Sequence, residues 1–494
     1  MFAHFFTSTA DTAVAVSRAV AKGEIRRIRR GLYTTDLITP LPELVQRHLW
    51  EVVRLLFPGH VIGYRTALEL RPSPESTVHL VGSIERRRDV EGLKIWCHQG
   101  TGPIEGDRPY MGSLYLASRA RAFLECLRPS RAGRRFGDKA LSRTDVEERL
   151  DHLLRLRGET ELNRLRDDAR SLRDAMDAHE EFRQLDGIIG ALLRTRHTAL
   201  ASPIARARAL ERPYDPDRLI LFQELHRFLA ANPLGDLAER HAPGTEAFSK
   251  AAFFDSYFSN WIEGTEFGLD EAREIVTSGR IPQDRPADGH DVLGTFDLVS
   301  DTTFMTGALG RSLSDTASFI GLLHEAHRRI MSGRPEMDPG QFKVRPNRAG
   351  TTLFVDPTLV EGTLHEALGL VETLPEGMCR AAYLMFVISE VHPYADGNGR
   401  VARAVMNAAL VSAGQVRVII VSGYRDDYLR ALKTMSQRSD PLPYTRMLAR
   451  AQRFMAELPI EDYEATKLLL QRTGALDDTG ERRLRLPSEI GERI

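Results

Sequence analysis

The sequence predicts a mainly α-helical protein in which an α+β region at the N-terminus precedes an all-helical C-terminal domain with a small β-hairpin. From Asp217 onward nearly every long segment repeats apolar residues at helical spacing, whereas short strand-like runs interrupt the helical patterns nearer the N-terminus. A chain of 494 residues is also too long for one ordinary hydrophobic core. Two or three domains are therefore expected.

The N-terminal part contains short elements of both kinds. Apolar residues near helical spacing predict helices over residues 11–21 and 41–57. The strand-like runs predict strands over 61–62, 78–81 and 93–96, with a charged turn at Glu85–Arg88 before the last of them.

Changes of composition divide the chain into five expected parts. Residues 142–176 are rich in Arg, Glu, Asp and Leu at helical spacing, so they predict solvated connecting helices, and prolines at 203, 213 and 216 mark breaks after them. The parts are a segment at 1–40, an α+β domain at 41–140, a helical connector at 141–211, a helical domain at 212–460 and a C-terminal tail at 461–494.

The composition excludes several classes of protein. Hydrophobic residues make up 42% of the chain and charged residues 27%, as in a soluble globular protein. The 67 basic and 68 acidic residues nearly cancel, so a nucleic-acid or membrane partner would need a local patch. Cys97, Cys126 and Cys379 lie far apart, which excludes a disulfide framework and a zinc ribbon and favours the cytoplasm. The apolar run 381–388 is far shorter than the roughly 20 residues that span a bilayer, so no membrane partner is expected.

The most informative stretch is a polar loop between two apolar helical patterns. Residues 381–391 predict a buried helix, and residues 401–411 predict a second helix with Gly414 at its C-terminal end. The loop residues are thus presented at the N-terminus of the second helix. Gly397 and Gly399 allow positive φ and close approach of a ligand to the backbone, so successive N–H groups can form an anion-binding nest.

Four side chains add charge and proton transfer to this nest. Arg400 and Arg403 are three positions apart on the second helix, so both can face the nest and neutralise a polyphosphate. Asp396 offers a carboxylate oxygen suited to Mg²⁺, which usually binds one carboxylate together with phosphate oxygens. His392 is the side chain of this loop that takes a proton near neutral pH. An anion cradle, a metal ligand and a base together predict phosphate-transfer chemistry.

Residues 392–403, with the sequence HPYADGNGRVAR, resemble the signature of the Fic family, except that Tyr394 stands where the family usually has phenylalanine. The resemblance spans about residues 212–460. It implies an all-helical domain that uses ATP and Mg²⁺ to transfer AMP to a Ser, Thr or Tyr hydroxyl of a target protein. It also implies His392 as the base, Asp396 as the metal ligand, Gly397, Asn398 and Gly399 as the cradle of the α- and β-phosphates, and Arg400 and Arg403 as contacts of the outer phosphates.

Residues 259–264, with the sequence SNWIEG, resemble the inhibitory motif of the same family. The resemblance implies that Ser259 and Glu263 restrain the site. Glu263 would pair with Arg403, occupy the place of the γ-phosphate and leave ATP in a pose unfit for attack. Because the motif precedes the loop in the same chain, this inhibition would be intramolecular.

Other stretches carry weaker resemblances to the family. Residues 351–357 alternate like a strand of a short hairpin and lie where the family has its target-docking flap. Residues 424–429 resemble the segment that closes the adenine side, which makes Tyr428 either a nucleotide contact or a core residue. His324 and His327 lie on a helical pattern before the flap and are expected to be structural.

The N-terminal part carries a different resemblance. Residues 23–34, with the sequence GEIRRIRRGLYT, resemble the wing of winged-helix, AbiEi-type antitoxins and regulators, and residues 62–70 resemble the segment that follows the wing. This implies a winged-helix-like segment at 1–40 and an antitoxin-like or regulator-like domain at 41–140. Four arginines within residues 26–30 would suit phosphate contacts, so DNA is a candidate partner.

The residues support three hypotheses about function. The leading one is an autoinhibited protein adenylyltransferase that acts on target proteins in the cytoplasm. The alternatives are removal of AMP at the same site, with Glu263 orienting water, and a DNA-binding regulator whose Fic domain only senses nucleotide. The presence of both His392 and Asp396 favours an enzyme, because a sensor needs the cradle but not the base. The target, the activating signal and the oligomeric state stay open, and a homo-oligomer is compatible with the sequence.

Overall fold

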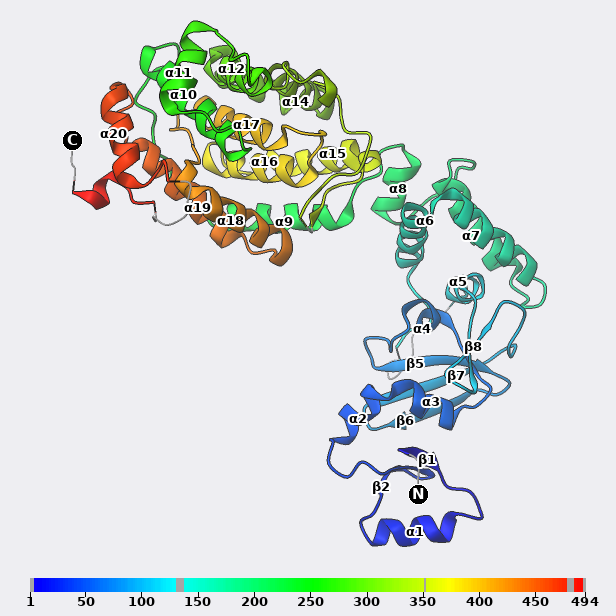
Figure 1. Ribbon diagram of the computed structural model, residues 1–494. Helices are drawn as coiled ribbons and strands as arrows, with labels where there is room; N and C mark the ends of the chain where they lie inside the picture. Colours follow the sequence, from blue (N-terminus) through cyan, green and yellow to red (C-terminus); the bar gives the residue numbers. More distant parts are fainter. Residues whose placement is uncertain (1–3, 130–136, 351, 478–483, 492–494) are drawn as a thin grey trace. The chain divides into compact units, whose positions relative to one another are not determined.

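The chain folds into two compact units, residues 1–211 and 212–494 (Figure 1). A computed structural model describes residues 4–129, 137–350, 352–477 and 484–491. Within these ranges unit 1 combines helices with two β-sheets, and unit 2 combines helices with a two-stranded hairpin. The predicted fold class, mainly α with an α+β region at the N-terminus, is confirmed.

Unit 1 begins with a small β-α-β-β arrangement. Its three strands form an antiparallel sheet in the order β1-β3-β2, and a register shift between Arg27 and Arg29 marks a bulge in the β2–β3 hairpin. Val16 and Ala19 of the helix pack with Ile25 in a small apolar cluster. The elements are β1 Phe5–Thr7, α1 Ala13–Ala21, β2 Arg26–Arg29 and β3 Leu32–Thr34. The winged-helix resemblance of this segment stays a prediction.

A six-stranded mixed sheet follows, with the strand order β6-β7-β5-β4-β9-β8. Strand β5 runs parallel to β7 and β4 runs parallel to β9, while the other neighbours are antiparallel. The elements are α2 Leu41–Arg47, α3 Leu49–Leu56, β4 Val61–Ile62, α4 Tyr64–Glu69, β5 Thr77–Gly82, β6 Arg86–Val90, β7 Leu93–Gln99, β8 Arg108–Tyr110, β9 Leu114–Leu116 and α5 Arg119–Leu127.

Two expectations for this region need correction. The charged turn expected at Glu85–Arg88 is wrong, because Arg86 to Arg88 lie in β6, which pairs with β7 at the edge of the sheet. An edge strand tolerates these charges because one side of it faces solvent, and charge there discourages pairing with other chains. The single helix expected over 41–57 is two helices, because the backbone at His48 leaves the helical region (φ −111°, ψ 31°).

Three further helices complete unit 1, and they pack into its hydrophobic core as well as connecting the two units. Their apolar faces share a hydrophobic cluster with α5, in which Phe123, Leu150 and Ile188 are buried together. The first helix is interrupted at Gly158, whose φ of 77° lies outside the helical region. The helices are α6 Arg143–Leu172, α7 His179–Leu192 and α8 Pro203–Ala209.

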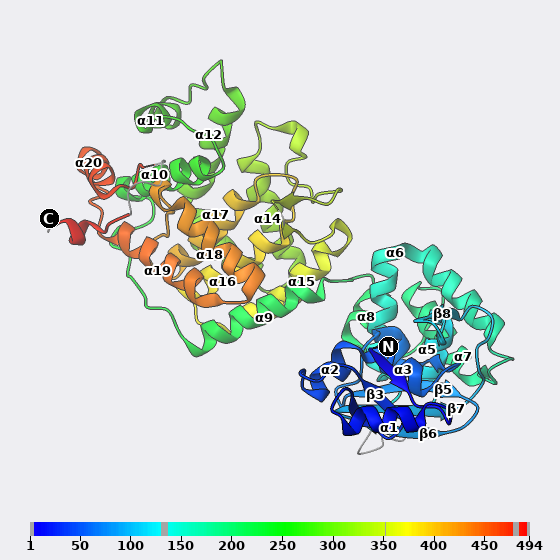
Figure 2. The same ribbon diagram turned by 60° about the horizontal axis from the view of Figure 1, so that its bottom comes forward.

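Unit 2 packs its helices around α16 and α17, which lie in the middle of the unit in both views (Figures 1 and 2). Helix α16 is apolar on nearly every face and therefore buried along almost its whole length. It contacts α9, α15 and α17, while α17 also contacts α10, α12 and α14. The α-helices are α9 Pro216–Ala231, α10 Glu246–Ile262, α11 Leu269–Ser278, α12 Pro286–Ser300, α13 Leu309–Ser312, α14 Thr316–Ile330, α15 Val360–Val371, α16 Met378–Val391, α17 Asn398–Ser412, α18 Arg425–Arg438, α19 Pro441–Ala456 and α20 Tyr463–Thr473.

Short elements join these helices. They are the π-helix η1 Phe304–Ala308, the 3₁₀ helices η2 Pro335–Met337, η3 Pro357–Leu359, η4 Ser422–Tyr424 and η5 Pro487–Ile490, and the hairpin strands β10 Arg348–Ala349 and β11 Thr352–Leu353. Within the segment expected as a tail, 461–494, residues 463–473 form α20, and Tyr463, Leu469 and Leu470 of this helix are buried in the main hydrophobic cluster of the unit. Among the described residues, none of the helices has the length and apolar character that crossing a bilayer requires.

Candidate active site

The loop between α16 and α17 has a fixed backbone conformation. His392 ends α16 in the left-handed region (φ 51°), and Gly397, at φ 76°, caps the N-terminus of α17. The Asn398 side chain closes the loop, since its Oδ1 accepts from the Tyr394 amide (2.8 Å) and its Nδ2 donates to the Tyr394 carbonyl (2.9 Å). The Asn398 side chain is therefore a loop clasp, and only the backbone of this residue is left to contribute to an anion cradle.

His392 lies under the hairpin as a neutral imidazole. Its Nδ1 donates to the Ser389 carbonyl (3.2 Å), which can only accept, so Nε2 keeps its lone pair. The Phe354 ring stacks on the imidazole with 3.8 Å between ring centroids and 3° between planes. Burial, assisted by the positive charge of Lys343, lowers the pKa of His392 to about 4. A neutral imidazole is the form that accepts a proton.

A short segment before the hairpin holds this loop from outside. Lys343 donates through its amide to the Pro393 carbonyl (2.9 Å) and through Nζ to the Val391 carbonyl (3.3 Å) and Asn347 Oδ1 (2.7 Å). The Asn347 amide group in turn donates to the Tyr394 carbonyl (2.9 Å). Burial lowers the pKa of Lys343 to about 8. Carbonyls on both sides of His392 are thereby fixed, a support that sequence reasoning missed.

The hairpin predicted at residues 351–357 is present as β10 and β11, although Thr351 lies outside the described residues. Arg218 of α9 anchors it by donating to the Leu353 carbonyl (2.5 Å). The same guanidinium pairs with the buried Glu390 carboxylate (2.7 Å), two residues before His392. Arg218 thus links the hairpin to the end of α16.

The histidines of α14 support the loop from its other side. The His327 ring stacks on Tyr394 with 3.8 Å between centroids. Its Nδ1 accepts from the Gly340 amide (2.8 Å), so its Nε2 must carry the proton that it donates to the Asp396 carbonyl (3.1 Å). Burial lowers the pKa of His327 to about 4. His324 bonds the Tyr394 hydroxyl through Nδ1 (3.2 Å). Both histidines make the structural contacts that the sequence predicts for them.

The start of α17 forms a narrow cradle. A Cβ on Gly399 would lie 2.2 Å from Oε1 of Glu263, and a Cβ on Gly397 would lie 2.8 Å from the Met331 sulfur. Neither position therefore has room for a side chain. The Glu263 carboxylate lies against Gly399 in the first turn of α17, where the free N–H groups and the helix dipole favour an anion.

Arg403 ties this carboxylate to the helix. Its guanidinium pairs with Glu263 (2.7 Å) and donates to Ser259 through both the hydroxyl (3.0 Å) and the carbonyl (2.9 Å). It also donates to the Tyr428 hydroxyl (3.3 Å). Burial alone would lower the pKa of Arg403, but the Glu263 carboxylate raises it above its ordinary value. Ser259, Glu263, Arg403 and Tyr428, which were predicted from separate stretches of the sequence, thus lie together. Tyr428 is a buried core residue that contacts Arg403.

Glu263 is itself positioned by the end of α10. The helix stops at Ile262, and Asn260 accepts the amides of Glu263 (3.0 Å) and Thr265 (3.1 Å) through its carbonyl. Arg425, at the start of α18, donates to the Ile262 carbonyl (3.1 Å). Arg425 thereby holds the C-terminal end of α10, a second support that sequence reasoning missed.

Arg400 is held by a partner that the sequence did not reveal. Its buried guanidinium pairs with Asp291 of α12 at 2.5 Å and with Asp396 at 3.3 Å. Arg334 pairs with the same Asp291 oxygen at 2.8 Å. Asp291 lies 109 residues before Arg400, and no local pattern marks it. The contact expected between Arg400 and outer phosphates stays a prediction.

The predicted metal ligand lies at the open side of this ion-pair network. The Asp396 side chain is 44% exposed, and one oxygen bonds Arg400. Within the described part of the chain no group of three or more His, Cys, Asp and Glu side chains could hold a metal by itself. A single accessible carboxylate beside an anion cradle fits Mg²⁺ that binds together with a nucleotide, because phosphate oxygens would supply the other ligands.

Comparisons with known proteins match this site region. The sequence model of the Fic/DOC family matches residues 320–410, which include the whole loop. Similar relatives are protein adenylyltransferase Fic of Nematostella vectensis, 28% identical over 292 residues (55% of this chain, 63% of the relative), and that of Drosophila grimshawi, 26% identical over 239 residues (48% and 47%). This chain therefore spans about half to three fifths of the length of these curated relatives.

Solved structures of Fic proteins also align with the chain. Fic-1 (residues 134–508) from C. elegans aligns over 67% of this chain and 90% of its own, with 20% identity and a TM-score of 0.36. A Fic family protein from Desulfovibrio desulfuricans G20 aligns over 57% of this chain and 85% of its own, with 19% identity and a TM-score of 0.35.

Proposed function

Since residues 320–410 form a Fic/DOC family domain, we propose that this chain is a protein adenylyltransferase that transfers AMP from ATP to a Ser, Thr or Tyr hydroxyl of a target protein. One observation carries the proposal: a neutral imidazole with a free Nε2, on His392, lies in the loop that leads into the glycine-lined N-terminus of α17. The negative charges of Glu263, at the cradle, and of Asp396, the proposed metal ligand, both raise the pKa of His392. The proposed base, cradle and metal ligand therefore lie close enough to interact electrostatically.

The chain's own groups account for each part of this reaction. Nε2 of His392 takes the proton of the target hydroxyl as its oxygen attacks the α-phosphorus. The new bond joins that oxygen to phosphorus, the bond from phosphorus to the β-phosphate oxygen breaks, and pyrophosphate leaves. Asp396 would hold Mg²⁺, whose charge neutralises phosphate oxygens when it is bound. The first amides of α17 would hold the phosphates, so that catalysis rests mainly on positioning and charge neutralisation.

We further propose that Glu263 inhibits the transferase in the same chain. Its carboxylate lies against Gly399 and pairs with Arg403, where an anionic phosphate would otherwise bind. A nucleotide that binds while Glu263 stays in place has lost the Arg403 contact. Its α-phosphorus is then out of line with the attacking hydroxyl, which costs rate because the reaction depends on alignment.

The experiment is self-labelling with ATP labelled at the α-phosphate in the presence of Mg²⁺. Glu263→Gly should label at least about 10-fold faster than the wild type, since it frees Arg403 and the cradle. Adding His392→Ala to Glu263→Gly should lower the rate by about 10² to 10⁴-fold. His327→Gln is the matched control for a histidine near the loop, and it should label in the Glu263→Gly background far better than the His392 variant.

Two outcomes would contradict these proposals separately. If Glu263→Gly protein takes no label from α-labelled ATP, the transferase hypothesis fails. If wild type and Glu263→Gly label equally fast and both depend on His392, the transferase hypothesis stands and the inhibitory role of Glu263 fails. Release of AMP from labelled protein by the wild type, and not by Glu263→Gly, would identify removal of AMP as a second activity.

For unit 1 we propose a contact with DNA phosphates through the β2–β3 hairpin. The arginines within Arg26–Arg30 form no ion pair among the described residues. Arg29 of this hairpin also acts on Arg88 of β6: burial, together with the positive charges of Arg86 and Arg29, lowers the pKa of Arg88. Crowded, unneutralised guanidinium groups suit a polyanion.

Gel shifts with duplex DNA should weaken steeply between about 50 and 200 mM salt and should be lost in Arg27→Glu/Arg30→Glu. Binding that ignores salt, or that survives this variant, would contradict the contact.

A further inference from the structure

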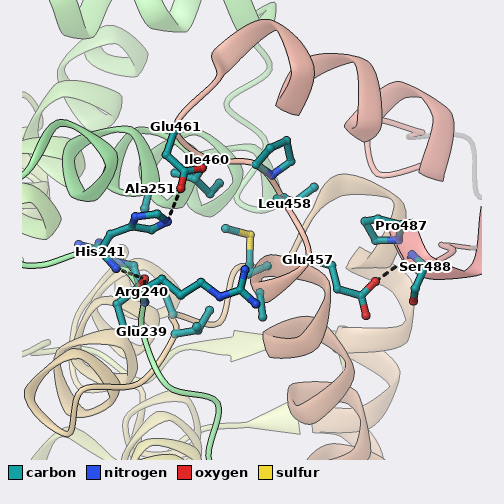
Figure 3. A pocket seen from close by; sticks show the side chains of 15 residues that line it. Glu239, Arg240, His241, Ala251, Glu457, Leu458, Ile460, Glu461, Pro487 and Ser488 are labelled. Atoms are coloured by element: carbon teal, nitrogen blue, oxygen red, sulfur yellow. Dashed lines mark hydrogen bonds and ion pairs between the residues drawn. The ribbon is translucent and has the colours of Figure 1, made fainter. Parts of the chain in front are cut away.

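Unit 2 contains a cavity of about 440 Å³ that none of the site residues above lines. Its walls come from the α9–α10 loop, the N-terminal half of α10, the segment after α17, the end of α19 with the loop that follows it, and η5 (Figure 3). Its apolar lining includes Ala251, Val416, Met455, Leu458, Ile460 and Pro487. The size lies in the range of pockets that take small organic molecules.

The acidic side chains of this cavity already have partners. Glu239 accepts the amides of Arg240 (2.7 Å) and His241 (3.0 Å). Glu457 accepts the Ser488 amide (2.9 Å) and pairs with a neighbouring arginine. Glu461 pairs with His241 at 3.4 Å. Each of these acids therefore has at least one bonding partner, and Glu457 pairs with a side chain that is always charged.

The positive charge is less well paired. Arg240 extends into the middle of the cavity from the α9–α10 loop (Figure 3), and among the described residues its guanidinium has neither a hydrogen bond nor an ion pair. A second lining residue, Arg417, is 2% exposed. Its Nη1 donates to the Val299 carbonyl (2.9 Å) and to Asp255 (3.3 Å), but its Nη2 has no partner within the described residues. Arg417 already pairs with Asp255, and its Nη2 is shielded from the cavity. The exposed guanidinium of Arg240 is therefore the group that can form a new pair with an anion here.

The cavity also borders the helix that carries the inhibitory glutamate. Ala251 of α10 lines it, and the neighbouring Lys250 donates to the Glu461 carbonyl on the opposite wall (2.6 Å). Helix α10 runs on without a break from this point to Ile262, next to Glu263. At 1.5 Å per residue the cavity wall and Glu263 are about 18 Å apart on one rigid element.

We propose that this cavity binds a small carboxylate with an apolar body, and that its occupancy changes how firmly α10 holds Glu263 on Arg403. The carboxylate would form a bidentate pair with Arg240, and the apolar body would contact the aliphatic lining. The second half of the proposal rests on the proposed function of Glu263, whereas the first half does not. A ligand shifts α10 only if it binds one position of the helix better than another.

The binding test uses calorimetric titration of the full chain, without nucleotide, with acetate, hexanoate, octanoate and benzoate. Octanoate or benzoate should bind saturably and at least about 10-fold tighter than acetate, because acetate lacks the apolar body. Arg240→Ala should weaken this binding at least about 10-fold, and Arg240→Lys should restore part of it. Arg280→Ala, an exposed arginine outside the cavity, is the matched control and should bind like the wild type.

Unchanged melting of Arg240→Ala without ligand would show that its loss of binding is not a loss of fold. No saturable binding by any of the four carboxylates would overturn the site, as would binding that Arg240→Ala leaves intact. The link to α10 is tested by self-labelling, in which the bound carboxylate should change the wild-type rate and leave Glu263→Gly unchanged. The link would be overturned if the carboxylate changed the labelling rates of wild type and Glu263→Gly equally, or left the wild-type rate unchanged. The titration would still show whether the cavity binds the carboxylate.

Discussion

His392 combines burial with the proposed role of a catalytic base. Burial lowers its pKa to about 4, so the ring is neutral at physiological pH but intrinsically a weak proton acceptor. Negative charge nearby raises the pKa of an imidazole, and a bound nucleotide would bring several negative oxygens to the cradle. The base would therefore become stronger when the substrate is in place. This arrangement keeps the residue uncharged in the free protein and suited to proton transfer in the complex.

The Phe354 ring should control the acid limit of activity. In a Glu263→Gly background, kcat/KM for ATP should stay level as the pH falls from 8 to about 5 and drop near pH 4, because kcat/KM reports the free enzyme. Phe354→Ala removes a ring that buries the imidazole, so the pKa of His392 rises and the drop moves to higher pH. Phe342→Ala removes a ring that contacts Tyr394 and not His392, and it should leave the limit in place. Identical profiles for both variants would contradict this role of Phe354.

Lys343 should act on the orientation of His392 and not on nucleotide binding. Lys343→Met removes the Nζ bonds to Asn347 and the Val391 carbonyl but keeps the amide bond to Pro393. The labelling rate of Glu263→Gly protein at saturating ATP should fall about 10- to 100-fold, since small errors in position are costly. Binding of a fluorescent ATP analogue should stay within about 2-fold, and Lys343→Arg should recover part of the rate. Equal losses in rate and in nucleotide affinity would indicate general damage instead.

At the scale of elements, the site is the meeting of two helix ends. The C-terminal end of α10 brings Glu263 to the N-terminal end of α17, so a carboxylate meets free N–H groups and the positive end of a helix dipole. Helix α18 contributes Tyr428 against Arg403 and Arg425 against the end of α10. The position of Glu263 therefore depends on how α10 and α18 are held together as well as on its own ion pair.

Loss of the Arg425 contact should loosen this arrangement. Arg425→Ala removes one hydrogen bond, worth about 0.5–1.5 kcal/mol, from the carbonyl of Ile262. Basal self-labelling should rise roughly 2- to 10-fold and stay below that of Glu263→Gly, which shows no further rise when Arg425→Ala is added. Arg430→Ala is the matched control on the same helix, because Arg430 is exposed and pairs only with Asp427 among the described residues. Equal rates for the two arginine variants would rule out this function for Arg425.

The sequence predicts the elements of the site better than its supports. The loop 392–403 could be located because glycine, arginine, aspartate and histidine stand close together between two apolar helical patterns. Asp291 and Lys343 could not, since each is a single charged residue whose partner lies far along the chain. The strand β6 was missed for a related reason, because a run of arginines is typical of a turn until its edge position in a sheet is known.

At the scale of the whole molecule, the chain joins two units with separate interiors. Unit 1 has a mixed sheet with a helical layer, and unit 2 has a helical core around α16 and α17. The match to the Fic/DOC family model lies in the second unit, at residues 320–410. The sequence locates the change of composition between the units but not the packing of 141–211 into the first. That packing depends on which face of each charged helix is buried, a property that weak periodicity does not define.

Two interiors should give two unfolding transitions. Leu150 of unit 1 and Leu225 of unit 2 are both fully buried leucines in separate hydrophobic clusters. Leu→Ala at such a position costs about 2–5 kcal/mol, which for a unit of this size lowers the melting temperature on the order of 5–15 °C. In calorimetry Leu150→Ala should lower one transition and Leu225→Ala the other, and ATP with Mg²⁺ should raise only the transition that Leu225→Ala lowers. A single transition that both substitutions lower equally would mean that the two units unfold as one cooperative body.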